Sequence, residues 1–242
     1  MNMNIDVKTI SLSAVFTVII FIFTVFFTIA TPATRGFFNI GETGVYIAAI
    51  VGGPIVGAIA GGLGSALADL FLGYGHYAPG TLIIKGIEGF ITGYIFLILK
   101  KISKKTRTIL GLGAAIFTVV FLGYLGRNGI DIILTIGNTT LTSHIPFWIV
   151  LAIALLLAFG LIYASVLGGE TSLMVFACLL GGIEMVLGYF LYEAFVLGFG
   201  LIAIAEIPIN IGQTVIGTSI AVPLVKALME MGVSVSSEES MG

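Results

Sequence analysis

Long apolar blocks limit the possible folds of this chain more than any other feature of its sequence. Seven of them follow one another, at about Thr9–Ala30, Thr43–Leu72, Thr81–Leu99, Thr108–Leu125, Ile145–Val166, Ser172–Leu197 and Ile202–Leu228. A helix of about 20 residues crosses the roughly 30 Å of hydrocarbon in a bilayer. Only 9% of the residues are charged, against about a quarter in a soluble domain. The sequence therefore predicts an all-α integral membrane protein, a polytopic helical bundle in the cell membrane.

Basic residues predict the orientation of the bundle. The one dense basic loop is Lys100–Arg107, which the positive-inside rule places in the cytoplasm together with Lys8 and Lys226. If Lys8 is cytoplasmic, the first helix carries Arg35 to the outside. An odd number of crossings must then lie between Arg35 and the basic loop.

The block Thr43–Leu72 must therefore cross twice. Gly52-Gly53-Pro54 offers a break in it, because proline disrupts a helix interior. The arm before the break, Thr43–Val51, would be only about 14 Å long at 1.5 Å per residue. The preceding loop must then dip into the membrane, which is tolerated where protein or a water-filled cavity surrounds it. This reasoning predicts about eight spanning elements, two cytoplasmic termini and a ligand near the dipping loop.

Polar residues recur at helical spacing inside three of the blocks. Such groups are costly in lipid, so each set should face the bundle interior. The sets are the row Gly53, Gly57, Gly61, Ser65 and Asp69, the row Thr81, Lys85, Glu88 and Thr92, and the row Glu206, Asn210, Gln213 and Gly217. The small residues indicate close helix packing. Lys85 is expected to pair with Glu88 or Asp69, or else to meet an anionic or carbonyl-rich ligand. The last row has two interpretations, interhelical hydrogen bonding and ligand recognition.

The sequence lacks the residues that several functional classes of protein require. A net charge of −2 argues against nucleic-acid binding, and a single cysteine, Cys178, excludes a disulfide framework. We find neither an H-E-x-x-H motif nor a nucleophile elbow, so we expect no catalytic residues, no metal site and no cofactor. The phosphate-binding G-x-x-x-x-G-K-[ST] pattern is also missing. If ATP drives the protein, another chain must hydrolyse it.

Three stretches resemble a known family. They are Phe38-Asn39-Ile40-Gly41-Glu42, the run from Gly53-Pro54 through Gly61-Gly62-Leu63-Gly64-Ser65 to Asp69, and Tyr77-Ala78-Pro79-Gly80-Thr81 with Lys85 and Glu88. With a later block, Gly188-Tyr189-Phe190, Glu193 and Glu206–Gln213, they resemble the riboflavin-type S components of energy-coupling-factor vitamin transporters. The resemblance implies a subunit that binds a vitamin or vitamin precursor from outside. It also implies docking onto a transmembrane coupling subunit that carries two ABC ATPase subunits.

By position in the family, the resemblance assigns ten substrate-binding residues: Phe38, Asn39, Glu42, Asp69, Tyr77, Lys85, Tyr192, Glu193, Asn210 and Gln213. It further implies docking through small residues of the first helix, which here are Ser13, Ala14 and Thr17. The family's alanine spacing is imperfect, because Ala14 is followed four residues later by Val18.

The chain also departs from the family in its number of helices. S components usually have six, so residues 108–166 are interpreted as an inserted helical hairpin within a single transmembrane domain, residues 1–242. The outer loop of this hairpin could cap the site or be unrelated to it. Residues 232–242 are expected to form a disordered tail.

Two other functional classes compete with an ATP-driven importer. The first is a self-sufficient, ion-coupled secondary transporter, because carboxylates in or near the spans can carry protons. An inverted repeat of two halves, which is usual for alternating access, is not evident. The second class is a membrane-embedded enzyme or a purely structural subunit.

Overall fold

The structure is a computed structural model and describes residues 6–136, 139–167 and 169–233. In this part of the chain seven helices are long and apolar enough to span a membrane. They are α1 (Val7–Phe26), α2 (Gly41–Leu72), α3 (Ala78–Lys101), α4 (Lys104–Leu125), α5 (Phe147–Leu167), α6 (Glu170–Leu191) and α7 (Ile207–Glu230). Short helical segments follow α4 (η1, Gly126–Asn128) and α6 (η2, Tyr192–Val196) and precede α7 (η3, Gly200–Glu206). The predicted polytopic helical membrane protein is confirmed.

Helix α2 folds back on itself at Gly53. This residue has φ 85° and ψ −178°, which is not helical and suits a residue without a side chain. In a straight helix residues 45 and 61 would lie about 24 Å apart along the axis. A Cβ on Gly61 would instead lie 3.2 Å from Val45 Cγ1, so the two arms are antiparallel. The predicted break is confirmed, and α2 counts as two of eight spanning elements.

The small residues of α2 let it approach α3 closely. A Cβ on Gly57 would lie 2.6 Å from the carbonyl oxygen of Gly89, and one on Gly61 would lie 2.7 Å from that of Lys85. Larger side chains would push the two helices apart. The row of small residues on α2 therefore serves packing. Because α2 and α3 lie so close together, Asp69 of α2 and Lys85 of α3 lie on neighbouring helices.

A small sheet, which the sequence analysis did not predict, covers the outer end of the bundle. Its strands β1 (Thr28–Thr31), β2 (Gly36–Asn39), β3 (Ile130–Ile136) and β4 (Thr139–Ile145) are all antiparallel, in the order β2-β1-β3-β4. The first helix was predicted to continue to Ala30, but it ends at Phe26 because the next residues pair with β2. The dipping loop is thus a β-hairpin.

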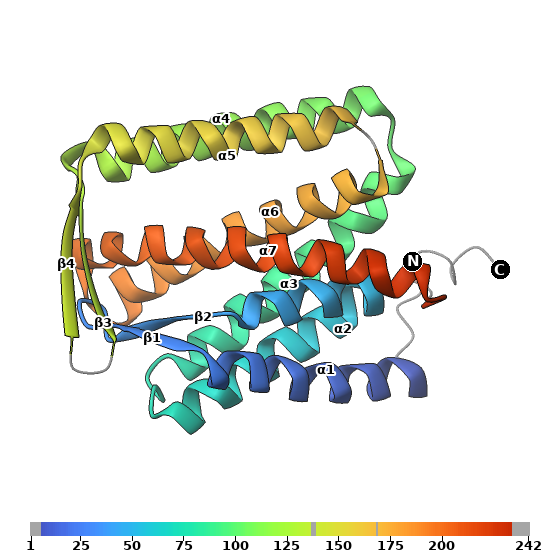
Figure 1. Cartoon of the computed structure of the whole chain (residues 1–242), viewed down its shortest axis with the longest axis horizontal. Coiled ribbons are helices and arrows are strands. Elements are labelled where there is room, and N and C mark those ends of the chain that lie inside the picture. The colour runs from blue at the N-terminus through green and yellow to red at the C-terminus, as the bar shows by residue number, and fades with distance from the viewer. Residues whose placement is uncertain (1–5, 137–138, 168, 234–242) are drawn as a thin grey trace.

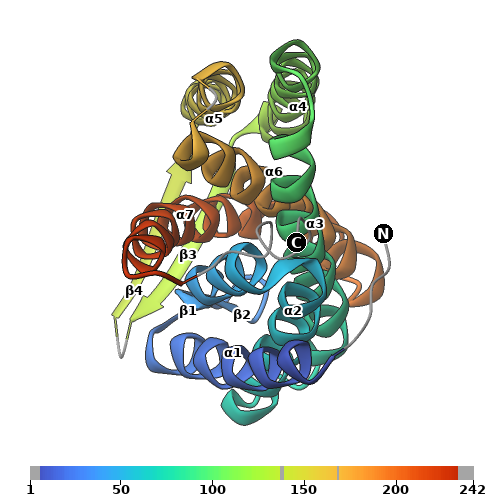
Figure 2. The same ribbon diagram turned by 90° about the vertical axis from the view of Figure 1, so that its right-hand side faces the viewer.

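Helices α4 and α5 lie side by side and pack against α6 (Figures 1 and 2). They correspond to the predicted hairpin, and β3 and β4 connect them. Strand β3 pairs with β1 at Thr135 and Ala30, so the outer loop of this hairpin joins the first loop in one sheet.

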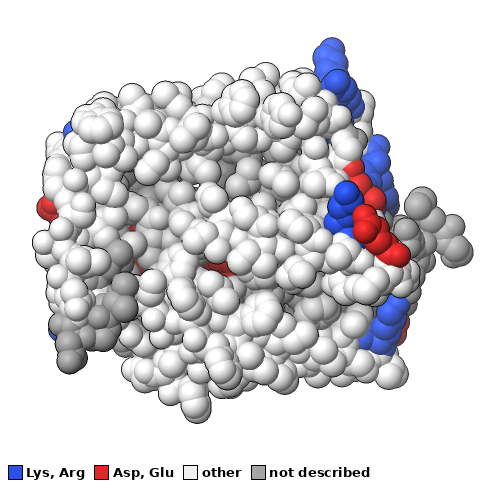
Figure 3. Space-filling view, viewed as in Figure 1, with Lys and Arg blue, Asp and Glu red and all other residues white. Residues whose placement is uncertain are grey.

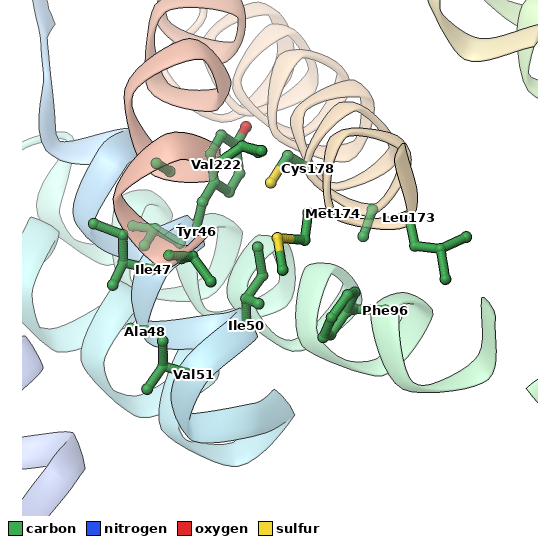
Figure 4. Packing of buried hydrophobic residues seen from close by; sticks show 14 of the residues in the cluster. Tyr46, Ile47, Ala48, Ile50, Val51, Phe96, Leu173, Met174, Cys178 and Val222 are labelled. Atoms are coloured by element: carbon green, nitrogen blue, oxygen red, sulfur yellow. The ribbon is translucent and has the colours of Figure 1, made fainter. Parts of the chain in front are cut away.

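The apolar core lies between both arms of α2 and helices α3, α6 and α7. Tyr46, Ile50, Phe96, Met174 and Cys178 are fully buried there (Figure 4). Buried cysteine behaves as a small apolar residue, as expected for Cys178. From Ser234 onward, the predicted disordered tail lies outside the described residues.

Charged side chains gather at one end of the molecule. Most of the Lys and Arg side chains in this view lie at the end where α1 begins and α7 ends, and the side surface is almost without charge (Figures 1 and 3). The sheet lies at the opposite end. This distribution agrees with a bundle that crosses the bilayer with its basic end in the cytoplasm.

Labelling of single cysteines tests this orientation. In a Cys178→Ala background, an impermeant thiol reagent added outside intact cells should modify His76→Cys and spare Ser103→Cys. Both positions are exposed, so accessibility within the fold does not distinguish them. Permeabilised cells, in which both positions should react, provide the control. Labelling of position 103 but not of 76 in intact cells would contradict the topology.

Candidate functional site

A cavity lies at the outer ends of the helices, beneath the β1–β2 hairpin. Its walls come from β2, the end of α2, the start of α3, the end of α6 with η2, and the start of α7. The lining residues are Gly36, Phe37, Asn39, Asp69, Tyr77, Thr81, Lys85, Tyr189, Glu193, Glu206, Asn210 and Gln213. Seven of the ten predicted site residues are among them: Asn39, Asp69, Tyr77, Lys85, Glu193, Asn210 and Gln213.

Glu206 holds the first loop against the start of α7. Thr31 Oγ1 donates to its Oε1 at 2.9 Å, and Thr34 Oγ1 donates to its Oε2 at 2.6 Å. All three side chains are buried. The carboxylate thus fixes the end of β1 and the turn after it as one wall of the cavity.

Tyr77 links the same turn to η2. Its hydroxyl lies 2.8 Å from the carbonyl oxygen of Thr34 and 3.0 Å from Oε1 of Glu193. Burial, with the nearby Glu193 and Glu206, raises the pKa of the Tyr77 phenol, which therefore keeps its proton. A phenol has one proton, so it cannot fully satisfy both acceptors at once.

The polar row on α7 faces inward, as predicted. Gln213 Oε1 accepts from the backbone N–H of Asn39 at 3.0 Å, and Gln213 Nε2 donates to Asn210 Oδ1 at 2.7 Å. Asn39 Oδ1 in turn accepts from the N–H of Gly41. These bonds join α7 to β2 and orient both amides along the cavity wall.

Lys85 lies at the inner side of the cavity and is bound by two carboxylates. It forms an ion pair with Glu88 at 3.1 Å and another with Glu42. Glu88 also accepts from the Tyr46 hydroxyl at 3.0 Å. The predicted pairing with Glu88 is confirmed, whereas the second partner is Glu42 rather than Asp69.

Three predicted residues do not line the cavity. Phe38 alternates with Phe37 and Asn39 along β2, so it faces the other side of the strand and packs against Phe27. Glu42 lies below the cavity with Lys85. Tyr192 packs on Gly80, where a Cβ would lie 2.5 Å from the ring, and donates to the carbonyl oxygen of His76.

Five lining residues were not among the predicted site residues. Thr81 and Glu206 lie on polar rows that the sequence showed, and Tyr189 lies one turn before Glu193 on α6. The other two, Gly36 and Phe37, could be assigned only once the strand was known, because nothing in their types suggests a site. Among the described residues no group of three or more His, Cys, Asp or Glu side chains has an arrangement that could hold a metal ion.

Comparison with known proteins identifies the family of this chain. Residues 4–167 match the family model of the S component of ECF-type riboflavin transporters. The chain belongs to this family. The predicted resemblance is thus confirmed, and the chain is a multi-pass protein of the cell membrane.

Two curated relatives of this S component match shorter stretches. An uncharacterized protein in gap 3′ region of Pyrococcus woesei is 48% identical over 66 residues, which cover 27% of this chain and 44% of that protein. The thiamine precursor transporter HmpT of Lactococcus lactis subsp. cremoris (strain MG1363) is 32% identical over 91 residues, or 37% and 55% of the two chains. The chain thus spans about half the length of these relatives. No solved structure shows significant similarity to it.

Proposed function

We propose that this S component is the substrate-binding subunit of an ATP-driven importer for a vitamin or vitamin precursor such as riboflavin. The observation that supports this best is the cavity, because polar groups from five segments converge in a space at the outer end of a membrane bundle. Ligand sites in proteins are typically concave, with a few polar groups among aromatic walls. The name of HmpT adds support for a precursor of a vitamin as the ligand.

ATP hydrolysis is assigned to other chains. The sequence lacks a phosphate-binding loop, so the proposal includes a transmembrane coupling subunit and two ABC ATPase subunits as partners. No enzymatic activity of its own is expected.

Helix α1 is the proposed docking surface for the coupling subunit. It is the least buried of the spanning helices among the described residues. Of the predicted docking residues, Ala14 lies on the exposed face, Thr17 is half-buried and Ser13 is buried. Docking would therefore use Ala14 and its exposed neighbours Val15 and Val18.

A secondary transporter is the second candidate, since Asp69 and Glu193 are buried carboxyl groups that could carry protons. Proteoliposome uptake of the ligand that co-purifies with the protein separates the two candidates. We expect uptake only with the coupling module and ATP inside, and no saturable Mg-dependent ATP binding by the isolated chain. Uptake by this chain alone, driven by a proton gradient, would contradict the proposal.

A further inference from the structure

A second cavity lies where helices α4 and α5 face α6 and α7. Helix α4 contributes Phe117 and Leu122 to its wall, α5 contributes Leu157, α6 contributes Ile183 and α7 contributes Ile211. A further cavity, under β3 and β4, shares Leu122 and Ile211 with it. The two cavities therefore adjoin and extend from the middle of these helices to their outer ends. We call this combined space the lateral groove.

The wall of the lateral groove is almost entirely hydrocarbon. Among the described residues that line it, only Thr118 and Thr214 have polar side-chain atoms. Both hydroxyls donate within their own helices, to the carbonyl oxygens of Ala114 and Asn210. A buried water or polar ligand needs several hydrogen-bond partners, and these two side chains have no further proton to donate. The part of a ligand that meets this wall must therefore be apolar.

The lateral groove is open to the bilayer. Phe117 in its wall is 44% exposed, and Leu157, Ile183 and Ile211 are half-buried. These residues belong to helical segments that are long and apolar enough to span a membrane. At this depth the solvent of the protein is the hydrocarbon of the lipids. An empty gap here would lose dispersion contacts along its wall, so an acyl chain that fills it stabilises the structure.

A basic residue lies at the outer end of α4, at the depth of the lipid headgroups. Tyr124 lies one turn after Phe121 on the same side of α4, and the guanidinium of Arg127 lies 4.4 Å from the centre of the Tyr124 ring. Tyr124 and Trp148 are 64% and 68% exposed, as is typical of aromatic residues at the membrane interface.

The guanidinium of Arg127 has donors to spare for a lipid phosphate. The side chain is exposed, and within the described part of the chain it donates from Nη1 to the carbonyl oxygen of Tyr124. A guanidinium has about five N–H donors in a planar arrangement that suits phosphate. Asp131, the nearest acidic residue in the sequence, pairs with His144 instead. The outer end of the lateral groove thus presents a positive charge.

We propose that the lateral groove binds one phospholipid of the outer leaflet. An acyl chain lies along the apolar wall between the α4–α5 pair and helices α6 and α7, and the phosphate meets Arg127. The lipid fills the gap between the inserted hairpin and the rest of the bundle and so holds the hairpin in place. No described residue lines both this groove and the cavity beneath the β1–β2 hairpin, so the lipid site is independent of the proposed function.

Native mass spectrometry of the full chain, released from nanodiscs of palmitoyl-oleoyl phosphatidylglycerol, tests the proposal. Wild-type protein should retain one phosphatidylglycerol per chain. Leu157→Trp fills the groove with a larger side chain and should reduce the retained lipid at least about tenfold. Leu156→Trp is the matched control, because this neighbour on α5 is 71% exposed and lies outside the groove lining. It should retain as much lipid as the wild type.

Arg127→Gln tests the contact with the phosphate. In competition, wild-type protein should bind the phosphatidylglycerol at least about fivefold more tightly than palmitoyl-oleoyl glycerol, which has the same chains and no phosphate. Arg127→Gln should remove this preference and still bind the chains. An unchanged preference in this variant would show that the phosphate does not meet Arg127, and would overturn the proposal.

Melting curves show whether each variant is folded. If Leu157→Trp does not fold, Ile183→Trp tests the groove from the side of α6. Wild-type protein without retained lipid, or a folded groove variant that retains as much lipid as Leu156→Trp, would overturn the proposal. An equal loss in Leu156→Trp would do so as well, because the lipid would then belong to the general lipid shell. A two-chain species that a groove variant dissociates would assign the groove to a second copy of this chain and also overturn it.

Discussion

Replacing Asn210 by leucine is expected to weaken ligand binding by about 5- to 150-fold while the protein still folds and inserts. The substitution removes the donor and acceptor of an amide that lines the cavity, and a lost hydrogen bond at a buried site corresponds to roughly 1–3 kcal/mol. It also removes the acceptor of Gln213 Nε2. Isothermal titration with the co-purifying ligand, together with a melting curve, measures both effects.

Ser219→Leu is the matched control for this prediction. It also exchanges a polar residue of α7 for leucine, but Ser219 is exposed and only donates to the carbonyl oxygen of Val215 within the helix. Its affinity for ligand should equal that of the wild type. If Asn210→Leu lowers the melting temperature and leaves the affinity intact, the polar row of α7 only joins helices, and its assignment to the ligand site is wrong.

Replacing Lys85 by methionine is expected to lower the free energy of unfolding by about 3–5 kcal/mol. Lys85 is buried between Glu42 and Glu88, so its removal leaves two carboxylates without a cation in the interior of the bundle. The melting temperature in detergent should fall accordingly. Adding Glu42→Gln and Glu88→Gln removes these charges and should restore much of the lost stability.

Lys226→Met provides the comparison for Lys85→Met. This lysine also pairs with a glutamate on its own helix, Glu230, but at 4.0 Å and with both side chains largely exposed. Exposed pairs contribute about 0–1 kcal/mol, so its loss should hardly change the melting temperature. A decrease for Lys85→Met no larger than for Lys226→Met would show that the buried network does not stabilise the fold.

The spanning elements were predictable because lipid imposes strict rules on sequence. Apolar length predicted the helices, and the placement of Lys8, Arg35 and Lys100–Arg107 required an odd number of crossings. The odd number of crossings, together with Gly52-Gly53-Pro54, predicted the break that the structure has at Gly53. Charges and prolines are rare in such a chain, so each one is informative.

The outer sheet was not predictable by the same reasoning. Strand β1 continues an apolar block without a change in composition, so the block appeared to be one helix up to the proline at position 32. Strand β3 pairs with β1 across about 100 residues of sequence, and no local pattern shows such a pairing. The missed strand also explains why Phe38 does not line the cavity, because side chains alternate between the two faces of a strand.

Long-range pairing limited the prediction of the site in a similar way. Lys85 and Glu88 are one turn apart on one helix, so their pairing could be expected. Glu42 lies 43 residues before Lys85, and only the reversal of α2 at Gly53 brings it to the same ion pair. Spacing along a helix shows which residues share a face, whereas tertiary packing decides what that face meets.

Native mass spectrometry of the purified protein tests the central claim most directly. If the chain captures a small ligand in the cavity beneath the β1–β2 hairpin, wild-type protein should carry one small organic molecule per chain, which dissociates on activation. Asn210→Leu should carry much less of the same molecule, and Ser219→Leu should carry as much as the wild type. Wild-type protein without any bound molecule after addition of candidate vitamins and precursors, or equal occupancy in Asn210→Leu, would contradict the account.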